Sequence, residues 1–389
     1  MGILCAQLFT EYANPVSPAT TARPVPPPVR RLGRRLLGSG LLEALATPHG
    51  VDRYLELVRP SWSLHEARAE VIEVRRQTAG SVTLILRPNE NWKGFRTGQF
   101  VRLTVEIDGV RQTRCYSPAC SAHAPDRIEI TVRAHPEGRV SGFLNREAHA
   151  GMVVGLSPAD GDFVLPSDRP EHLLLISGGS GITPVMSMLR TLCDEGHAGA
   201  VTFMHYAPTR DDVVYRSELA GIASRHANVR LVHAYTRDTG GALSGHLCRE
   251  HLGAVAPNAA AAETYVCGPP GLIESARRIW AEDGVEERLH IESFLPPSPG
   301  IAGDSAEGSV SFARTGERIA NSGRSLLEQA ERAGLSPQFG CRMGICHTCT
   351  CRKTAGTVRN LITGDVSSAD DEDIQICVSV PAGDVELDL

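Results

Sequence analysis

Four cysteines near the end of the chain have the spacing of an iron–sulfur ligand set. Cys341, Cys346 and Cys349 follow a Cys-x4-Cys-x2-Cys pattern, and Cys377 comes after 27 further residues. Thiolates are soft ligands that suit iron, and this spacing is the plant-type [2Fe–2S] pattern. A zinc site, the alternative, would favour paired Cys-x2-Cys units or histidine ligands. We therefore predict four cluster ligands, with Cys351 as a packing thiol beside them.

A second group of residues has the chemistry to hold a flavin and its phosphates. Arg114, Tyr116 and Ser117 end a predicted strand: an arginine can clamp a pyrophosphate, a tyrosine can cover a flavin face, and a serine hydroxyl can reach a ring nitrogen. Downstream, a Gly-x-x-Ser run opens a predicted helix whose first amides suit phosphate. Alone, the pattern also fits a surface arginine and an ordinary strand tyrosine. The candidate residues are Arg114, Tyr116, Ser117, Gly138, Val140 and Ser141.

A glycine-rich turn between a buried strand and a helix is the third candidate site. The stretch LLLIS is followed by GGSGITP, and such a turn lets a pyrophosphate approach bare backbone amides. Further on, CGPP ends another apolar strand at the edge where open α/β sheets bind ligands. A tight structural turn and a buried cysteine are the alternative interpretations. The candidate residues are Gly178, Gly179, Gly181, Thr183, Pro184, Cys267, Gly268 and Pro269.

The patterns around these motifs predict several domains. Short Val-, Ile- and Thr-rich runs broken by Gly, Pro and Asp indicate an antiparallel barrel or sandwich. Continuous apolar strands alternating with helices then indicate a parallel, doubly wound sheet. A Pro/Gly/Ser linker precedes a compact α+β unit with the cysteines. The predicted limits are 1–66 for a disordered arm plus helical extension, 67–166 for the barrel, 167–294 for the α/β domain, 295–308 for the linker and 309–389 for the last domain.

Composition and charge narrow the class of protein further. With 42% apolar and 22% charged residues among 389, the chain is typical of globular proteins, and no apolar run approaches a membrane span. Residues 301–389 hold eight Lys and Arg against thirteen Asp and Glu, which argues against nucleic acid and for a basic partner. The first residues make a poor export signal, so we expect a cytoplasmic protein. A basic amphipathic helix near 31–45 either packs on the next domain or contacts a membrane surface peripherally.

Taken together, the order of these motifs resembles the ferredoxin–NADP reductase superfamily fused to a ferredoxin. The resemblance covers residues 67–389, and it is nearest to NADPH oxidoreductases that serve stearoyl-CoA desaturases. Reductases of phenylacetyl-CoA epoxidase and of phthalate dioxygenase share the domain order. It implies an antiparallel β-barrel FAD domain, an α/β parallel-sheet NADP-binding domain and an α+β β-grasp [2Fe–2S] ferredoxin domain.

The resemblance also implies roles for residues at the flavin. Arg114 resembles the arginine on the FAD pyrophosphate, Tyr116 the aromatic on the flavin, and Ser117 the hydroxyl near N5. Cys267 matches the cysteine beside the site of hydride transfer, and Glu292 an active-site glutamate. Ser117, Cys267 and Glu292 are accordingly the expected catalytic residues.

Two further sites follow from the same resemblance. Phe294 stands where the family has a terminal aromatic over the flavin, but here the chain continues past it. Thr236 and Arg237 stand where NADPH-selective members have Ser-Arg, and an arginine there can pair with the 2′-phosphate. Because no acidic residue occupies that point, NADPH is favoured over NADH; Arg210 and Arg216 are the next candidates for the phosphate.

The expected activity is electron transfer from NADPH through FAD and the [2Fe–2S] cluster to an acceptor protein. The expected acceptor is a membrane fatty-acid desaturase or hydroxylase. The alternatives are the reductase of a soluble ring-hydroxylating oxygenase, with FMN and NADH, and a redox-sensing iron–sulfur protein. The acidic run 370–373 lies shortly before Cys377, and we expect it to form a docking face or an ordinary solvated loop.

Overall fold

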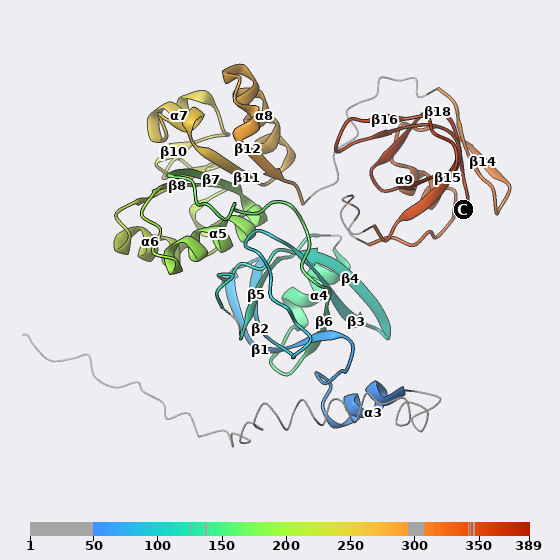
Figure 1. Ribbon diagram of the computed structural model, residues 1–389, viewed down its shortest axis with the longest axis horizontal. Helices are drawn as coiled ribbons and strands as arrows, with labels where there is room; N and C mark the ends of the chain where they lie inside the picture. Colours follow the sequence, from blue (N-terminus) through green and yellow to red (C-terminus); the bar gives the residue numbers. More distant parts are fainter. Residues whose placement is uncertain are drawn as a thin grey trace, which may run out of the picture.

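The computed structural model describes residues 50–124, 126–136, 138–294, 307–340, 342, 344 and 347–389. The helix expected near 31–45, nearly all of the expected linker, and the predicted ligands Cys341 and Cys346 lie outside these residues. Figure 1 shows three separate sheet-containing units that follow one another along the chain. None of the described helices is long and apolar enough to cross a membrane.

A short helix, α3 (Gly50–Val58), precedes the first unit and is held against it by polar contacts. The Asp52 carboxylate accepts hydrogen bonds from the Ser63 hydroxyl at 2.8 Å and from the Leu64 amide at 2.7 Å. Arg68, on the first strand of the barrel, reaches back to Glu56 of α3 at 2.6 Å. The helix is therefore an extension of the barrel.

The first unit is a six-stranded antiparallel sheet in the order β4-β3-β6-β1-β2-β5. Alternating burial along β3 shows one face of its side chains turned into the core, as expected for a strand covered on one side. A bridge between Pro118 and Ile130 joins the end of β4 to β5 and closes the sheet into a barrel. Its elements are β1 (Ala67–Thr78), β2 (Ser81–Pro88), β3 (Val101–Ile107), β4 (Val110–Tyr116), β5 (Ile128–Arg133), α4 (Arg139–Glu147) and β6 (Val153–Leu156).

The second unit is a parallel sheet in the order β10-β9-β8-β7-β11-β12, with apolar cores on both faces. Strands β8, β9 and β10 extend the sheet from one side of β7, and β11 returns to its other side. The strand order thus reverses at β7, and open α/β sheets bind ligands at such a point. The elements are β7 (His172–Gly178), α5 (Ile182–Asp194), β8 (Ala200–Ala207), α6 (Arg216–Arg225), β9 (Val229–Tyr235), β10 (Leu243–Ser244), α7 (Arg249–Val255), β11 (Glu263–Cys267), α8 (Pro270–Asp283) and β12 (Leu289–Glu292).

The third unit is a mixed sheet in the order β14-β13-β18-β15-β16, with β17 paired to β15 and one helix packed on it. Only its first strand, its helix and a closing strand were expected from sequence. The long β15 was missed because its sequence, TCRKTAGTVRN, is polar and has no clear alternation. The elements are β13 (Ser309–Phe312), β14 (Glu317–Ala320), α9 (Leu326–Arg332), β15 (Thr350–Asn360), β16 (Val366–Ser367), β17 (Glu372–Gln375) and β18 (Ser379–Leu387).

Candidate functional site

The end of β4 carries the three residues expected at the flavin. Arg114 is partly buried and donates to the Thr113 carbonyl at 2.7 Å. Burial raises the pKa of the Tyr116 hydroxyl. Ser117 is only 2% exposed, and its hydroxyl has no hydrogen-bond partner among the described residues. Because buried hydroxyls are nearly always paired, this orphaned group fits a bound flavin that offers it a partner.

The predicted Gly-x-x-Ser helix start is present, but its serine is used locally. Gly138 is the N-cap of α4, and Val140 is buried in the first turn. The Ser141 hydroxyl donates to the Gly138 carbonyl at 3.3 Å and accepts from the His135 amide at 3.2 Å. The Ser141 side chain therefore stabilises the turn, and phosphate binding by the first amides of α4 stays a prediction.

The glycine-rich turn and the CGPP segment contact each other through their backbones. A short 3-10 turn, η1 (Gly179–Gly181), joins β7 to α5. A Cβ at Gly181 would lie 2.2 Å from the Cys267 carbonyl oxygen, so any larger residue would separate the two strand ends. At Gly178, a Cβ would come within 2.8 Å of the Pro269 ring. The sequence thus brings two backbone segments into direct contact at the point where the strand order reverses.

The other residues of this segment support the turn. The Thr183 hydroxyl donates to the Ser180 carbonyl at 3.3 Å. Pro184 is buried in the first turn of α5, where its missing N–H costs nothing. Gly268 lies against the Gly178 amide, where a Cβ would approach to 3.0 Å.

A row of chemically active side chains crosses the parallel sheet at its carboxyl edge. Strand register pairs Glu292 with Cys267, Cys267 with Ser177, Ser177 with His205, and His205 with His233. The Ser177 hydroxyl lies 2.8 Å from Nδ1 of His205, and the two histidine rings meet edge to face at 6.3 Å. Five neighbouring strands therefore present one polar layer directly beneath the glycine-rich turn.

Burial controls the charge of this layer. Burial raises the pKa of the Glu292 carboxyl to about 8. Burial also raises the pKa of the Cys267 thiol, and the nearby Glu292 adds to this second effect. Burial lowers the pKa of His205 to about 3, with further contributions from His233 and Arg133. At neutral pH the layer consequently holds a protonated carboxyl, a thiol and a neutral imidazole. Within the described part of the chain, Oε2 of Glu292 and Nε2 of His205 have no partner.

Helix α5 also fixes the flavin-side segment that follows Ser117. The Ser187 hydroxyl donates to the Cys120 carbonyl at 2.7 Å, and Arg190 Nη1 donates to the Ala119 carbonyl at 2.7 Å. Arg190 also pairs with Glu129 of the barrel at 2.8 Å. One rigid helix therefore carries the glycine-rich turn at its start and holds the chain beyond Ser117 with its body.

Arg237 provides a cation at the predicted 2′-phosphate site. The Thr236 amide donates to Ala207 and the Arg237 amide to Pro208, so both residues directly follow β9 at the carboxyl edge of the sheet. The Arg237 side chain is exposed and forms no ion pair with a described residue. Arg216, the next candidate, already lies 3.5 Å from Asp211.

Phe294 lies just beyond β12, as the resemblance requires, but it packs partly buried against the core beneath α5. Its ring therefore already has apolar neighbours in the α/β unit. A flavin-stacking role for Phe294 stays a prediction.

Two of the four predicted cluster ligands are described, and their surroundings fit a cluster. Cys349 and Cys377 are each 3% exposed and belong to the core of the third unit. The Gly344 amide points at Cys377 Sγ, 3.3 Å away, which is the backbone donor that cluster sulfurs require. Gly344 has a φ of +72°, and a Cβ there would meet the Ile362 side chain at 2.6 Å. The loop therefore depends on glycine at this position.

The neighbouring Cys351 and the acidic run differ in how they match expectation. Cys351 packs against the core of the third unit, in agreement with a packing role. Only the first half of the acidic run is a loop: Asp370 and Asp371 lie in an exposed bend, whereas Glu372 begins β17 and pairs at 3.0 Å with the fully buried Lys353. Asp371 and Asp373 remain exposed on the outside.

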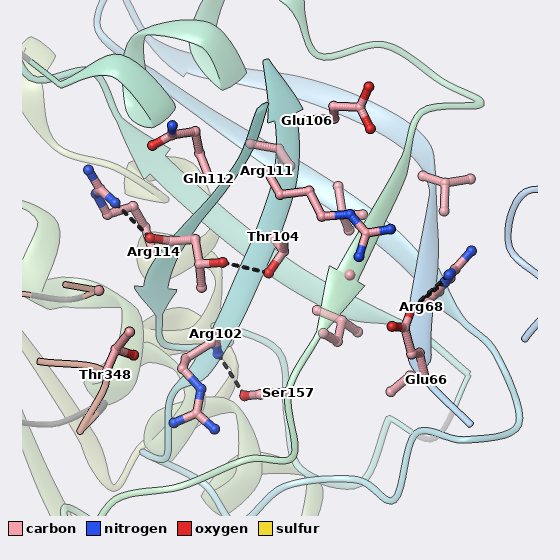
Figure 2. A pocket seen from close by; sticks show the side chains of 18 of the residues that line it. Glu66, Arg68, Arg102, Thr104, Glu106, Arg111, Gln112, Arg114, Ser157 and Thr348 are labelled. Atoms are coloured by element: carbon pink, nitrogen blue, oxygen red, sulfur yellow. Dashed lines mark hydrogen bonds and ion pairs between the residues drawn. The ribbon is translucent and has the colours of Figure 1, made fainter. Parts of the chain in front are cut away.

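The cluster loop borders two cavities. One, of about 1190 Å³, is lined by Arg114 and by Thr348 and the segment Ser336–Gly340, which lie on either side of the first cluster cysteines (Figure 2). The other, of about 760 Å³, is lined by Glu292, Gly344 and His347. Described residues around the cluster cysteines thus line one cavity together with Arg114 and another together with Glu292.

Comparison with known proteins assigns each unit. Residues 72–164 match the oxidoreductase FAD-binding domain, 175–278 the oxidoreductase NAD-binding domain, and 312–382 the 2Fe-2S iron-sulfur cluster binding domain. An NADPH oxidoreductase of Mycobacterium tuberculosis is 38% identical over 89% of this chain and 90% of its own. The chain belongs to the ferredoxin–NADP reductase family, with a C-terminal [2Fe–2S] domain. Its expected cofactors (FAD, a nicotinamide nucleotide and the cluster) and its oxidoreductase activity are thereby confirmed.

Other family members agree with this assignment. The reductase subunit of glycine betaine monooxygenase from Pseudomonas aeruginosa is 33% identical over 76% of this chain and 87% of its own. The structure of phthalate dioxygenase reductase matches with a TM-score of 0.54 at 23% identity, over 83% of this chain and 97% of that one. The expected three-part fold is confirmed. The domain limits and the roles of single residues stay predictions.

Sequence reasoning missed the residues that act across strands or domains. Ser177 and His205 are 28 positions apart, and Arg190 meets Ala119 across 71 positions. No local motif marks either pair. The one available signal was a polar residue within an apolar strand, since His205 interrupts AVTFMHYA and Ser177 ends LLLIS.

Proposed function

We propose that this protein passes electrons from NADPH through FAD and its [2Fe–2S] cluster to an acceptor protein. The observation that carries the proposal is the position of the cluster loop, which borders one cavity with Arg114 and another with Glu292. Electron transfer from flavin to cluster requires that the two groups lie close together, and the shared cavities support this because described residues around the cluster cysteines line both.

Within this proposal, the chain's own residues bind, orient and hold protons. Arg114 binds flavin phosphate, Tyr116 covers the ring, and the Ser117 hydroxyl hydrogen-bonds to the flavin edge. Cys267, packed against the glycine-rich turn, borders the nicotinamide, and the buried carboxyl of Glu292 holds a proton near the reacting atoms. Bound FAD supplies the chemistry that accepts a two-electron hydride and releases single electrons.

NADPH is the proposed nucleotide because Arg237 is an unpaired cation among the described residues at the end of β9. A guanidinium there pairs with a 2′-phosphate that only NADPH carries. The pyrophosphate would occupy the amides of Gly179 and Gly181 at the start of α5.

The proposed acceptor is a membrane fatty-acid desaturase or hydroxylase. Support comes from the motif resemblance and from apolar side chains exposed on and after α3: those of Tyr54, Leu57, Val58 and Trp62. Exposed side chains of this kind suit contact with a lipid surface. The second candidate, the reductase of an oxygenase, is supported by relatives with that role, among them the glycine betaine enzyme and a 3-ketosteroid-9-alpha-monooxygenase component.

The deciding experiment combines cofactor analysis with turnover. Purified protein should contain FAD, iron and sulfide, and should reduce both ferricyanide and cytochrome c with NADPH, faster than with NADH. Supplying a membrane desaturase or a soluble oxygenase as the final acceptor separates the two candidates. Absence of NADPH turnover in protein that carries all its cofactors would favour a redox-sensing role and overturn the proposal.

A further inference from the structure

The barrel and the α/β domain meet at a polar cluster that lies away from the glycine-rich turn. Figure 1 shows α5 and α6 on the side of the parallel sheet nearer the barrel. Arg190 stands at the centre of the cluster, roughly 13 Å farther along α5 than Gly181. Its side chain is only 14% exposed, and a cavity of about 540 Å³ opens beside it. The cluster is therefore separate from the places expected for flavin and nucleotide.

The Arg190 guanidinium holds both domains at once. Toward the barrel, Nη1 donates to the Ala119 carbonyl at 2.7 Å and to the Glu129 carboxylate at 2.8 Å. The Ala119 amide in turn donates to the Glu129 carbonyl at 2.8 Å, so these two barrel residues are fixed to each other. Within its own domain, Arg190 binds both carboxylate oxygens of Glu218 on α6, at 2.7 and 2.6 Å. Only the forked guanidinium can serve all these acceptors together.

Tyr215, which directly precedes α6, completes the contact between the domains. Its ring centroid lies 4.9 Å from the Arg190 guanidinium, its hydroxyl hydrogen-bonds to Thr131 of β5, and its amide donates to Gln77 of β1 at 3.3 Å. Tyr215 has a φ of +60°, a conformation that a bulky residue keeps only where its surroundings enforce it. We call Arg190 and Tyr215 the interdomain clamp.

The interdomain clamp joins the supports of the two reacting groups. Helix α5 begins at the glycine-rich turn expected to hold the nucleotide. Ala119 lies two residues after Ser117, whose unpartnered hydroxyl fits a bound flavin. Reacting atoms must approach to about 3–3.5 Å, and a displacement of about 1 Å can slow a reaction about 100-fold. The way α5 is seated on the barrel therefore bears directly on hydride transfer.

We infer that Arg190 is a positioning residue for hydride transfer, which sets the separation of nicotinamide and flavin by holding Ala119 and Glu129 against α5. Tyr215 keeps α6 in the same arrangement. The inference rests on the proposed function for the places of the two cofactors. It requires that the bonds of Arg190 to the barrel control the rate, whereas its pair with Glu218, inside one domain, does not.

The test follows flavin reduction when NADPH is mixed with oxidised holoprotein in a stopped-flow instrument. Arg190→Ala should slow hydride transfer about 10- to 100-fold and leave the dissociation constant of NADPH nearly unchanged. The long-wavelength charge-transfer absorbance of the nicotinamide–flavin pair should weaken, because it depends on how closely the rings stack. Glu129→Gln, which keeps the side-chain volume and weakens only the interdomain contact, should change both signals in the same direction. It also carries the test if Arg190→Ala does not fold.

Two control variants separate positioning from general support of the fold. Glu218→Gln makes the same chemical change to the other partner of Arg190 and should keep the wild-type rate and absorbance. Arg225→Ala removes an exposed arginine that lines the same cavity and forms no ion pair with a described residue, and it should also match wild type.

The decisive comparison is between the two glutamate variants. If Glu129→Gln does not slow hydride transfer more than Glu218→Gln does, the inference is overturned. An effect of Arg190→Ala on NADPH affinity alone also overturns it, because positioning acts on the rate. Wild-type holoprotein whose flavin NADPH cannot reduce would instead overturn the proposed function.

Discussion

Glu292 is the register neighbour of Cys267 across β12 and β11, and both side chains are buried at the edge of the parallel sheet. A carboxyl this deeply buried favours its neutral form, so burial raises its pKa to about 8. The same burial keeps the neighbouring thiol protonated. The pair can therefore border a hydride-transfer site without placing negative charge beside it.

The first prediction concerns stability against pH. A glutamate carboxyl ordinarily has a pKa of 4.5, whereas that of Glu292 in the folded protein is about 8. Between these two pH values the folded protein therefore keeps a proton that the unfolded chain has lost. The contribution of Glu292 to the free energy of unfolding should thus fall as the pH rises through this window, by on the order of 5 kcal/mol in total, while the lowered pKa of His205 contributes with the opposite sign below its ordinary value of 6.5. Urea unfolding of Glu292→Gln at several pH values should lack this decline. Glu274→Gln, at an exposed site on α8, should behave like wild type; an unchanged slope in Glu292→Gln would refute the assignment.

The second prediction separates the cluster from the flavin. Cys377→Ser should lose the visible absorption of the cluster, because a hydroxyl is a harder and weaker ligand for iron than a thiolate. Reduction of ferricyanide by NADPH should continue while reduction of cytochrome c collapses. Cys351→Ser is the control and should keep both activities. Parallel loss of both activities in Cys377→Ser would contradict the proposed order of electron transfer.

The third prediction addresses the choice of nucleotide. Arg237→Ala should raise the KM for NADPH about 10- to 100-fold, the loss of one charge-assisted contact, and leave the KM for NADH nearly unchanged. Arg230→Ala, an exposed arginine on β9, should alter neither constant. If Arg237→Ala changed the KM for both nucleotides equally, Arg210 or Arg216 would become the candidate for binding the 2′-phosphate.

The fourth prediction tests how α5 joins the two domains. Ser187 donates to Cys120, so the Thr97 hydroxyl, 3.0 Å away, must be the donor to Ser187. Ser187→Ala should therefore leave a buried carbonyl unpaired and lower the free energy of unfolding by about 1–3 kcal/mol. Ser224→Ala, whose hydroxyl bonds only within its own helix α6, should change stability little. Equal stability of the two variants would show that the interdomain bonds contribute nothing net.

The fifth prediction concerns the exposed acidic residues near the cluster. Asp371 and Asp373 lie 4.0 and 3.4 Å from Arg352 and are otherwise solvated. If they attract a basic acceptor, electron delivery should slow as salt shortens the Debye length below about 8 Å, and a double change to Lys should slow it at low salt. NADPH–ferricyanide turnover is the internal control. A flat salt dependence in wild type would remove the docking role.

Glu372 must be treated separately from its neighbours, because it neutralises the buried Lys353. Glu372→Gln should lower the stability of the third domain by about 2–3 kcal/mol, since it leaves an ammonium group without its counter-charge. The unfolding midpoint measures this effect. Electron delivery by the folded fraction of Glu372→Gln should remain as in wild type.

Sequence alone predicted what is local or periodic. The alternating pattern of β3 and the continuous apolar strand β7 each reflect burial on one face or on both, so their sheets could be assigned. The cysteine spacing and the glycine-rich turn likewise depend on neighbours in the chain. Each of these features is determined by residues that lie close together in the sequence.

The missed features depend on pairing partners that are distant in sequence. Strand β15 is polar because it lies partly exposed between β16, β17 and β18, and only its pairing makes it a strand. From the sequence, Lys353 is expected to be an ordinary surface lysine. In the structure it is buried and pairs with Glu372 of β17. In the same way, the acidic run looked uniform in sequence, although strand alternation turns one of its four charges inward.

The central position of β18 has a consequence for biosynthesis. This strand lies between β13 and β15, so within the described sheet the early strands are hydrogen-bonded to the middle ones through the last strand in sequence. Domains fold as units from the N-terminus during translation, and the two nucleotide-binding domains can be complete while β18 is still unmade. Cys377 lies two residues before this strand begins at Ser379. Metal loading is therefore expected to be the last step of maturation, after the flavin domain has already folded.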